Sequence, residues 1–249
     1  MVSAELSYQQ GADGLGNPTY TGLQLRIARA ASTVYDQPVT SRYCPGACIP
    51  EGLAGAPPAG PLQVIDLEGT GELTVVLHLY TGGEHCCEVL QVLSYDPGTG
   101  SYALAERDFG DAADLVSDVN GDRRLEIESA DDRFAYQFTS FAFSGLPLQI
   151  WRFQGGRFVE ATRGFARALG ADAARQWSAF LANRRRGLGL GFIAAWTADE
   201  VLLGRRAAAE RRLRGEARAH RLRSGDRLSP SGMAYIAKLN RFLARDGYR

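Results

Sequence analysis

The chain has 249 residues, and no apolar run in it reaches the roughly 18 residues that a membrane-spanning helix needs. Its length predicts one large or two smaller domains, with enough chain to bury a core. The balance of 28 Lys and Arg against 28 Asp and Glu excludes a uniformly basic or acidic protein, but residues 1–150 hold 20 acidic residues and 7 arginines, whereas residues 151–249 hold 8 acidic and 21 basic residues. The basic half indicates either an anionic partner or docking on the acidic half.

The beginning of the chain indicates export. Residues 2–4 (Val-Ser-Ala) are similar to the small-x-small end of a secretory cleavage site, so we expect a secreted or cell-envelope protein of bacterial type whose leader was replaced by Met1. The four cysteines favour the same oxidising compartment. Residues 23–27 alternate apolar side chains and predict a first strand, and residues 40–60, rich in Pro, Gly and Ala, predict a surface loop.

Residues 60–163 predict further strands. Residues 73–79 alternate apolar side chains as in a half-buried strand, which places His78 on the opposite face from Leu77 and Leu79. Residues 149–159 predict two strands joined by a Gly-Gly turn, the strongest hairpin signal in the chain, and residues 89–106 predict a similar hairpin.

Two pairs of cysteines allow alternative chemistry: Cys44 and Cys48 lie in the predicted surface loop, and Cys86 and Cys87 follow His85. Thiolates beside an imidazole suit zinc or copper, but successive side chains of a strand point to opposite faces, so we favour structural disulfides. The sequence does not choose among the three possible pairings. The main alternative is an enzyme or a redox or metal protein centred on His85, Cys86 and Cys87. No motif singles out catalytic or cofactor-binding residues.

Residues 118–126 carry the most informative motif of the chain. Oxygen-bearing side chains stand at its positions 1, 3, 5 and 9, and Gly121 permits a curl. Because Ca²⁺ prefers about six to eight oxygens in a flexible cage, we predict a calcium site. Its ligands would be Asp118, Asn120, Asp122, the Arg124 carbonyl and Glu126. An acidic hairpin turn without metal is the alternative, and the spacing excludes an EF-hand because no Glu stands at position 12.

The same pattern occurs earlier in the chain. Residues 66–74 align with residues 118–126 at an offset of 52, and residues 90–92 align with residues 148–150 at an offset of 58. The loop and its neighbouring strands resemble the calcium loops of FG-GAP/VCBS repeats, which occur in integrin-type β-propellers. The resemblance covers about residues 60–163 and implies calcium-dependent β-repeats. Thr70 and Thr74 stand where carboxylates are expected, so we predict no comparable ion in the first copy.

From about residue 164 the pattern becomes helical. Residues 197–200 have the form of a capping box and predict the start of one helix, and Ser229-Pro230 predicts the start of another. The last helix would bury an apolar stripe made of Met233, Ile236, Leu239 and Leu243. The arginine-rich run over residues 205–223 indicates either a solvated helix face or a surface for a polyanion.

These patterns predict an α+β protein with two domains. Residues 1–163 would form a β-repeat domain with the calcium loop, built as a partial propeller or a compact β-sheet assembly, because two or three repeats are too few for a full propeller. Residues 164–249 would form a basic helical bundle. We expect a non-catalytic binding protein whose partner is an extracellular protein or glycan. Polyanion binding by the basic half is a further alternative, and no nucleic-acid partner is expected.

Overall fold

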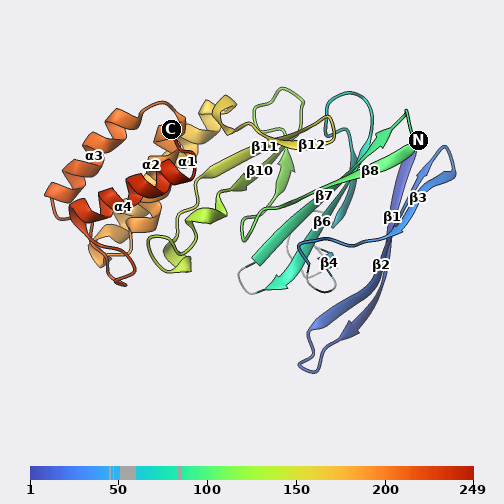
Figure 1. The fold of residues 1–249 in the computed structure, drawn as a ribbon, viewed down its shortest axis with the longest axis horizontal. Coiled ribbons are helices and arrows are strands. Elements are labelled where there is room, and N and C mark those ends of the chain that lie inside the picture. The colour runs from blue at the N-terminus through green and yellow to red at the C-terminus, as the bar shows by residue number, and fades with distance from the viewer. Residues whose placement is uncertain (45, 47, 51–59, 84–85) are drawn as a thin grey trace. The chain divides into compact units, whose positions relative to one another are not determined.

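The computed structural model of the protein describes residues 1–44, 46, 48–50, 60–83 and 86–249, without the side chain of Cys86. It confirms the predicted α+β class, with three antiparallel sheets followed by four α-helices (Figure 1). The chain divides into two compact units. The β unit comprises residues 1–129 and 151–160, and the helical unit comprises residues 130–150 and 161–249, so the chain passes between the units three times.

The first sheet is a three-stranded antiparallel meander in the order β1-β2-β3. Its strands are β1 (Val2–Ala12), β2 (Pro18–Arg29) and β3 (Ser32–Pro38). The first eight residues of β1 alternate between half-buried and exposed, as a strand with one covered face does. The predicted first strand over residues 23–27 lies inside β2, where Leu25 and Ile27 are buried.

The second sheet forms the centre of the β unit, with the order β4-β6-β7-β8 and with β5 also paired to β6. Its strands are β4 (Ile49–Pro50), β5 (Leu62–Ile65), β6 (Thr74–Gly83), β7 (Cys86–Asp96) and β8 (Ser101–Asp108). The expected half-buried strand is wrong, because all five residues from Val75 to Leu79 are fully buried and both faces of β6 are therefore covered. The hairpin predicted over residues 89–106 is confirmed, since Asp96 pairs with Ser101 across the β7–β8 turn.

The third sheet has the order β12-β11-β10-β9. Its strands are β9 (Leu115–Ser117), β10 (Glu126–Ala130), β11 (Leu148–Gln154) and β12 (Arg157–Glu160). The predicted Gly-Gly hairpin is confirmed: Gln154 pairs with Arg157, and Gly155 and Gly156 both have positive φ angles. A two-residue turn that needs positive φ at both positions explains why glycines stand there.

The second and third sheets share one arrangement of strands. β5, β6, β7 and β8 lie side by side in chain order, and so do β9, β10, β11 and β12. In each case an eight-residue loop joins the first strand to the second, because Ile65 pairs with Thr74 and Ser117 pairs with Glu126. The repeat found in the sequence is therefore also a repeat of structure. The described strands form open sheets and no closed propeller.

The helical unit contains α1 (Ala166–Asn183), α2 (Leu190–Leu202), α3 (Arg206–Arg218) and α4 (Gly232–Arg245), with short 3-10 turns at 132–134, 141–143, 162–164 and 184–186. None of the described helices is long and apolar enough to cross a membrane. Its core also contains Phe134 and Phe138, from the segment between β10 and β11. The predicted domain boundary after residue 163 lies close to the last passage of the chain between the units, after residue 160.

Two predicted helix starts are wrong. Thr197 lies in the middle of α2, where its hydroxyl donates to the Ile193 carbonyl at 2.6 Å instead of capping a helix. The last helix begins after an N-cap at Ser231, so Pro230 precedes the helix. Its predicted stripe holds for Ile236, Leu239 and Leu243, which are buried, and fails for Met233, which is exposed.

Candidate calcium loop

The loop that follows Ser117 turns back through two residues with left-handed backbone, Gly121 at a φ of 80° and Arg123 at a φ of 70°. The sequence motif accounts for Gly121 only. Arg123 carries a Cβ atom that disfavours this conformation, so other contacts must stabilise the turn.

Asp118 supplies these contacts. Its Oδ1 accepts the backbone N–H of Gly121 at 2.7 Å and of Asp122 at 3.1 Å, and its Oδ2 accepts the N–H of Arg123 at 2.8 Å. Three backbone donors converge on one carboxylate, and the loop is therefore closed around the first residue of the motif. The strained conformation of Arg123 is held by one of these three bonds.

Asn120 and Asp122 lie against each other in the same loop. The Asn120 amide donates to Asp122 Oδ2 at 3.0 Å, and the backbone N–H of Arg124 donates to Asp122 Oδ1 at 2.9 Å. The bond from Asn120 and then the bond from Arg124 lower the pKa of the Asp122 carboxyl group, so this side chain is an anion at neutral pH.

Glu126 closes the loop from β10 and is fully buried. Its Oε1 accepts a hydrogen bond from Nε of Arg152 at 3.1 Å and lies 3.0 Å from Nη2 of the same guanidinium, in an ion pair. Its Oε2 accepts the N–H of Val119 at 3.3 Å. Arg152 also lies 3.8 Å from Asp122. The motif contains no sign of this arginine, which lies 26 residues after Glu126 on β11. A resident positive charge thus stands at the edge of the loop.

The oxygen atoms of this loop are the donors that a bound Ca²⁺ would need. No group of three or more His, Cys, Asp or Glu side chains in the described part of the chain is drawn together as a metal site. Asp118 accepts three backbone N–H groups, Glu126 accepts one hydrogen bond from Arg152 and one from Val119, and Asp122 accepts two. The loop thus offers carboxylate and amide oxygens, which are the donors that Ca²⁺ prefers.

The first copy of the loop has two of the three backbone bonds. Asp66 accepts the N–H of Thr70 at 3.0 Å and of Gly71 at 2.8 Å, at the positions equivalent to Asp122 and Arg123. Gly71 has the matching positive φ, 85°. At the closing position, the Thr74 hydroxyl donates to the Ile65 carbonyl at 2.8 Å instead of offering a carboxylate. The curl of both loops therefore depends on their first Asp, whereas the charge at the closing position differs.

The cysteine stretch is described in part. Cys44 and Cys48 form a disulfide bond with a Cα–Cα distance of 5.5 Å. Cys87 is also disulfide-bonded, and none of the described cysteines is free. His85 and the Cys86 side chain lie outside the described part of the chain, so the predicted chemistry at His85-Cys86-Cys87 stays a prediction.

The histidine of β6 has a buried partner. His78 is completely buried, and its Nδ1 lies 3.2 Å from Oδ1 of Asp114, which is buried as well. Asp114 immediately precedes β9, so the pair links β6 to the segment that leads into the calcium loop motif. The sequence missed this pair because Asp114 lies 36 residues from His78 in a stretch with many other Asp residues.

Comparison with known proteins gives two partial similarities. The chain is 34% identical over 116 residues to a probable thylakoid lumen protein of Synechocystis, a match that covers 45% of this chain and 34% of that protein. It is 26% identical over 147 residues to an uncharacterized protein of Sinorhizobium fredii, covering 56% of this chain and 23% of that protein. The chain thus spans about a third or less of these relatives. No family model and no solved structure matches it.

Proposed function

We propose that this is an exported, non-catalytic binding protein whose β unit is stabilised by Ca²⁺ in the loop from Asp118 to Glu126. The observation that carries the proposal is the closed loop between the paired strands β9 and β10. Asp118, Asn120 and Asp122 lie together in this loop. The buried Glu126 contacts the same loop, because it accepts the backbone N–H of Val119. When bound, Ca²⁺ would supply positive charge that offsets the repulsion among three carboxylates.

The finer architecture belongs to the same proposal. We infer that the two four-stranded meanders are β-repeats similar to those of FG-GAP/VCBS proteins and form a partial propeller. Their common strand order and their equivalent loops support this assignment. In each repeat the loop joins the first strand to the second, which is where the resemblance places the calcium ligands.

Export is supported by two independent observations. The bond between Cys44 and Cys48 is of a kind that forms and persists in oxidising compartments. One relative is described as a probable thylakoid lumen protein, which lies in a compartment outside the cytosol. We therefore propose that this chain also acts outside the cytosol, where calcium is plentiful.

The experiment that tests calcium binding is thermal unfolding in calcium and in EDTA. At a calcium concentration about 100 times Kd, binding stabilises the native state by about 2.7 kcal/mol. For a chain of this size such a gain raises Tm by roughly 5 to 10 °C. Asp122→Asn should remove the difference, because it deletes a charge and keeps the shape of the side chain. Thr70→Asn places the same residue at the equivalent position of the first copy and should leave the difference intact. Identical melting curves for the native protein in the two buffers contradict the proposal.

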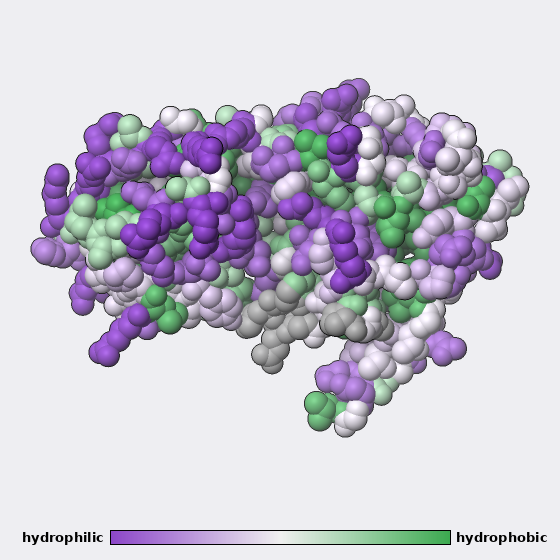
Figure 2. All heavy atoms as spheres, in the orientation of Figure 1, coloured by the Kyte–Doolittle hydropathy of each residue, from purple (hydrophilic) through white to green (hydrophobic). Residues whose placement is uncertain are grey.

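A second candidate function is polyanion binding by the helical unit. Hydrophilic side chains cover much of the visible face of this unit (Figure 2). On α3 the arginines at 211, 212, 214 and 218 are all exposed. Arg212 lies over the ring of Trp177 at 4.2 Å, and Arg214 lies 3.8 Å from Glu210 of the same helix. If this face binds polyanions, retention on heparin should fall steeply with salt and should drop in an Arg211→Gln, Arg218→Gln variant. Retention that is weak and unaffected by the variant contradicts this function.

A further inference from the structure

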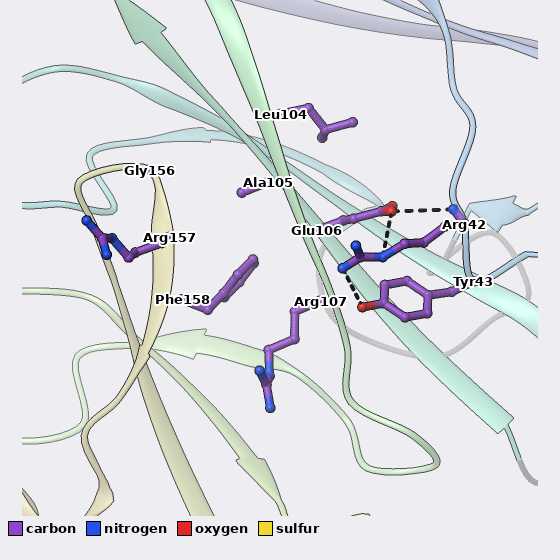
Figure 3. A pocket seen from close by; sticks show the side chains of 9 residues that line it. All are labelled: Arg42, Tyr43, Leu104, Ala105, Glu106, Arg107, Gly156, Arg157 and Phe158. Carbon is purple, nitrogen blue, oxygen red and sulfur yellow. Dashed lines mark hydrogen bonds and ion pairs between the residues drawn. The ribbon is translucent and has the colours of Figure 1, made fainter.

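A groove of about 500 Å³ opens in the β unit, lined by residues 42–43, 104–107 and 156–158 (Figure 3). This volume lies within the range of roughly 300 to 1,000 Å³ that is typical of ligand sites. The groove is distinct from the calcium loop, with which it shares no residue. Nothing in its lining belongs to the chemistry discussed so far.

The lining residues place the groove along the edges of two strands. Residues 104–107 are four consecutive residues of β8, and residues 157–158 are consecutive in β12. Successive side chains of a strand point to opposite faces, so a groove lined by all four must run along the edge of the strand and not over one face of the sheet. β8 and β12 are each the last strand of their sheets. An edge strand offers its backbone donors and acceptors to an added strand.

The groove combines an apolar part with positive charge. The β unit as a whole carries 8 Arg against 19 Asp and Glu, yet the groove contains three arginines and one glutamate. Glu106 is already engaged: it lies 3.5 Å from Arg42 and accepts a hydrogen bond from Gln91 at 3.2 Å. Counted together, the three arginines and this glutamate leave the lining with a net charge of +2. Arg42 has five N–H donors and directs only part of them to Glu106 and Tyr43, so it can also donate to a ligand.

Two of the three arginines are positioned by their surroundings. The guanidinium of Arg42 donates to the Tyr43 hydroxyl at 2.7 Å, as Figure 3 shows. The guanidinium of Arg107 lies over the ring of Trp151 at 3.4 Å, which fixes its plane. Arg157 is exposed on β12. Planar guanidinium groups in fixed positions recognise carboxylates in a bidentate manner.

The apolar part is equally well defined. The ring of Phe158 is packed edge-on against Phe109 and Phe153, with centroid distances of 6.3 and 5.3 Å. Leu104 is 46% exposed although it lies on a regular strand. An apolar side chain of a ligand would cover both residues and remove them from water.

We propose that the groove binds an acidic polypeptide segment in extended conformation, which lies along β8, directs carboxylates to Arg42 and Arg157, and places an apolar side chain over Leu104 and Phe158. The inference rests on the binding role proposed above, because it names the class of partner, but it does not depend on calcium. The edge-strand geometry favours a polypeptide over a sugar, since only a peptide backbone pairs with a strand edge.

The test is isothermal titration of the whole protein with a blocked hexapeptide of alternating aspartate and leucine. Binding should weaken about tenfold or more when asparagine replaces the aspartates, because charge-assisted hydrogen bonds are lost. An Arg42→Gln, Arg157→Gln variant should lose binding to the same extent. An Arg26→Gln, Arg167→Gln variant removes two exposed arginines outside the groove and should bind as the native protein does.

Each other outcome contradicts the proposal. Equal losses in the two double variants would mean that only overall charge matters, and equal affinity for the asparagine peptide would mean that carboxylates are not recognised. Binding of trigalacturonate with no binding of the peptide would assign the groove to acidic sugars. Titration in both calcium and EDTA separates this proposal from the preceding one. Peptide binding without a calcium-dependent rise in Tm overturns only the calcium loop, and the reverse result overturns only the groove.

Discussion

Carboxylates meet opposite environments in the two units of this protein. In the β unit Asp118 and Asp122 lie in an exposed loop and accept backbone N–H groups, and the pKa of Asp122 is lowered. In the helical unit Asp172 on α1 and Asp199 on α2 are buried, and burial, followed by the neighbouring Asp172 carboxylate, raises the pKa of Asp199 to about 10. The same residue type is an anion in one place and a neutral acid in the other, because solvent and neighbours decide its charge.

The two buried carboxyl groups differ in their hydrogen-bond donors. Asp172 already accepts the backbone N–H of Leu148 at 3.2 Å and the Nε–H of Arg175 at 2.9 Å, so it is the better acceptor. Neither carboxyl oxygen of Asp199 has a hydrogen-bond partner within the described part of the chain, and burial keeps this carboxyl group protonated. The comparison teaches that an acidic cluster found in a sequence does not reveal its charge until its burial and its donors are known.

The largest change in the free energy of unfolding is expected from raising the pH, because of Asp199. Its folded pKa is raised above the unfolded value of 3.8, so its stabilising contribution is complete below that value and is lost as pH rises toward 10. The free energy of unfolding should fall by up to about 1.4 kcal/mol per pH unit above neutrality, and Asp199→Asn should remove most of this slope. Denaturant titrations at several pH values measure it. Asp122→Asn is the matched control with an exposed carboxyl and should leave the slope unchanged. An unchanged slope in Asp199→Asn as well would contradict the raised pKa of Asp199.

A somewhat smaller loss of stability is expected when the buried Glu126 of the β unit loses its partner. Arg152→Met leaves Glu126 buried without its partner, and removing one member of such a pair costs about 3 kcal/mol. Adding Glu126→Leu should restore most of the loss, since an apolar pair replaces the ionic one. Urea unfolding of the single and double variants gives both values. A loss below about 0.5 kcal/mol in Arg152→Met would place this pair with weak surface pairs.

The smallest expected change in stability distinguishes the loop after Asp66 from the loop after Asp118. In EDTA, Asp66→Ala and Asp118→Ala should each cost about 1 to 2 kcal/mol, because each leaves backbone N–H groups without an acceptor. In calcium, only Asp118→Ala should cost more. Chemical denaturation of both variants in both buffers provides the four values. An equal extra cost in both loops would show that the first copy also binds the ion.

The sequence predicted the elements whose signals are local. Gly155-Gly156 and the turn after Asp96 demand special backbone angles that few residues supply, so both hairpins were found correctly. The two loops align through their leading Asp residues, and in the structure both loops have the two equivalent backbone bonds to that Asp. The calcium ligands themselves stay a prediction.

The missed features depend on contacts between distant residues. α2 is buried on nearly all sides, so its sequence has no amphipathic period, and the capping-box pattern at Thr197 was the strongest local signal left. Arg152 pairs with Glu126 across 26 residues. Phe134 and Phe138 join the helical core although they lie between two strands, and no local periodicity assigns them there.

The three passages of the chain between the units have a mechanical consequence. β10 ends at Ala130 and β11 begins at Leu148, and these strands lead directly into the segment that belongs to the helical unit. The same two strands carry Glu126, four residues before Ala130, and Arg152, two residues after Ile150. A force transmitted to β10 and β11 by the segment between them therefore acts across the Glu126–Arg152 ion pair. Because the chain passes between the units three times, no single cut of the backbone releases one unit from the other.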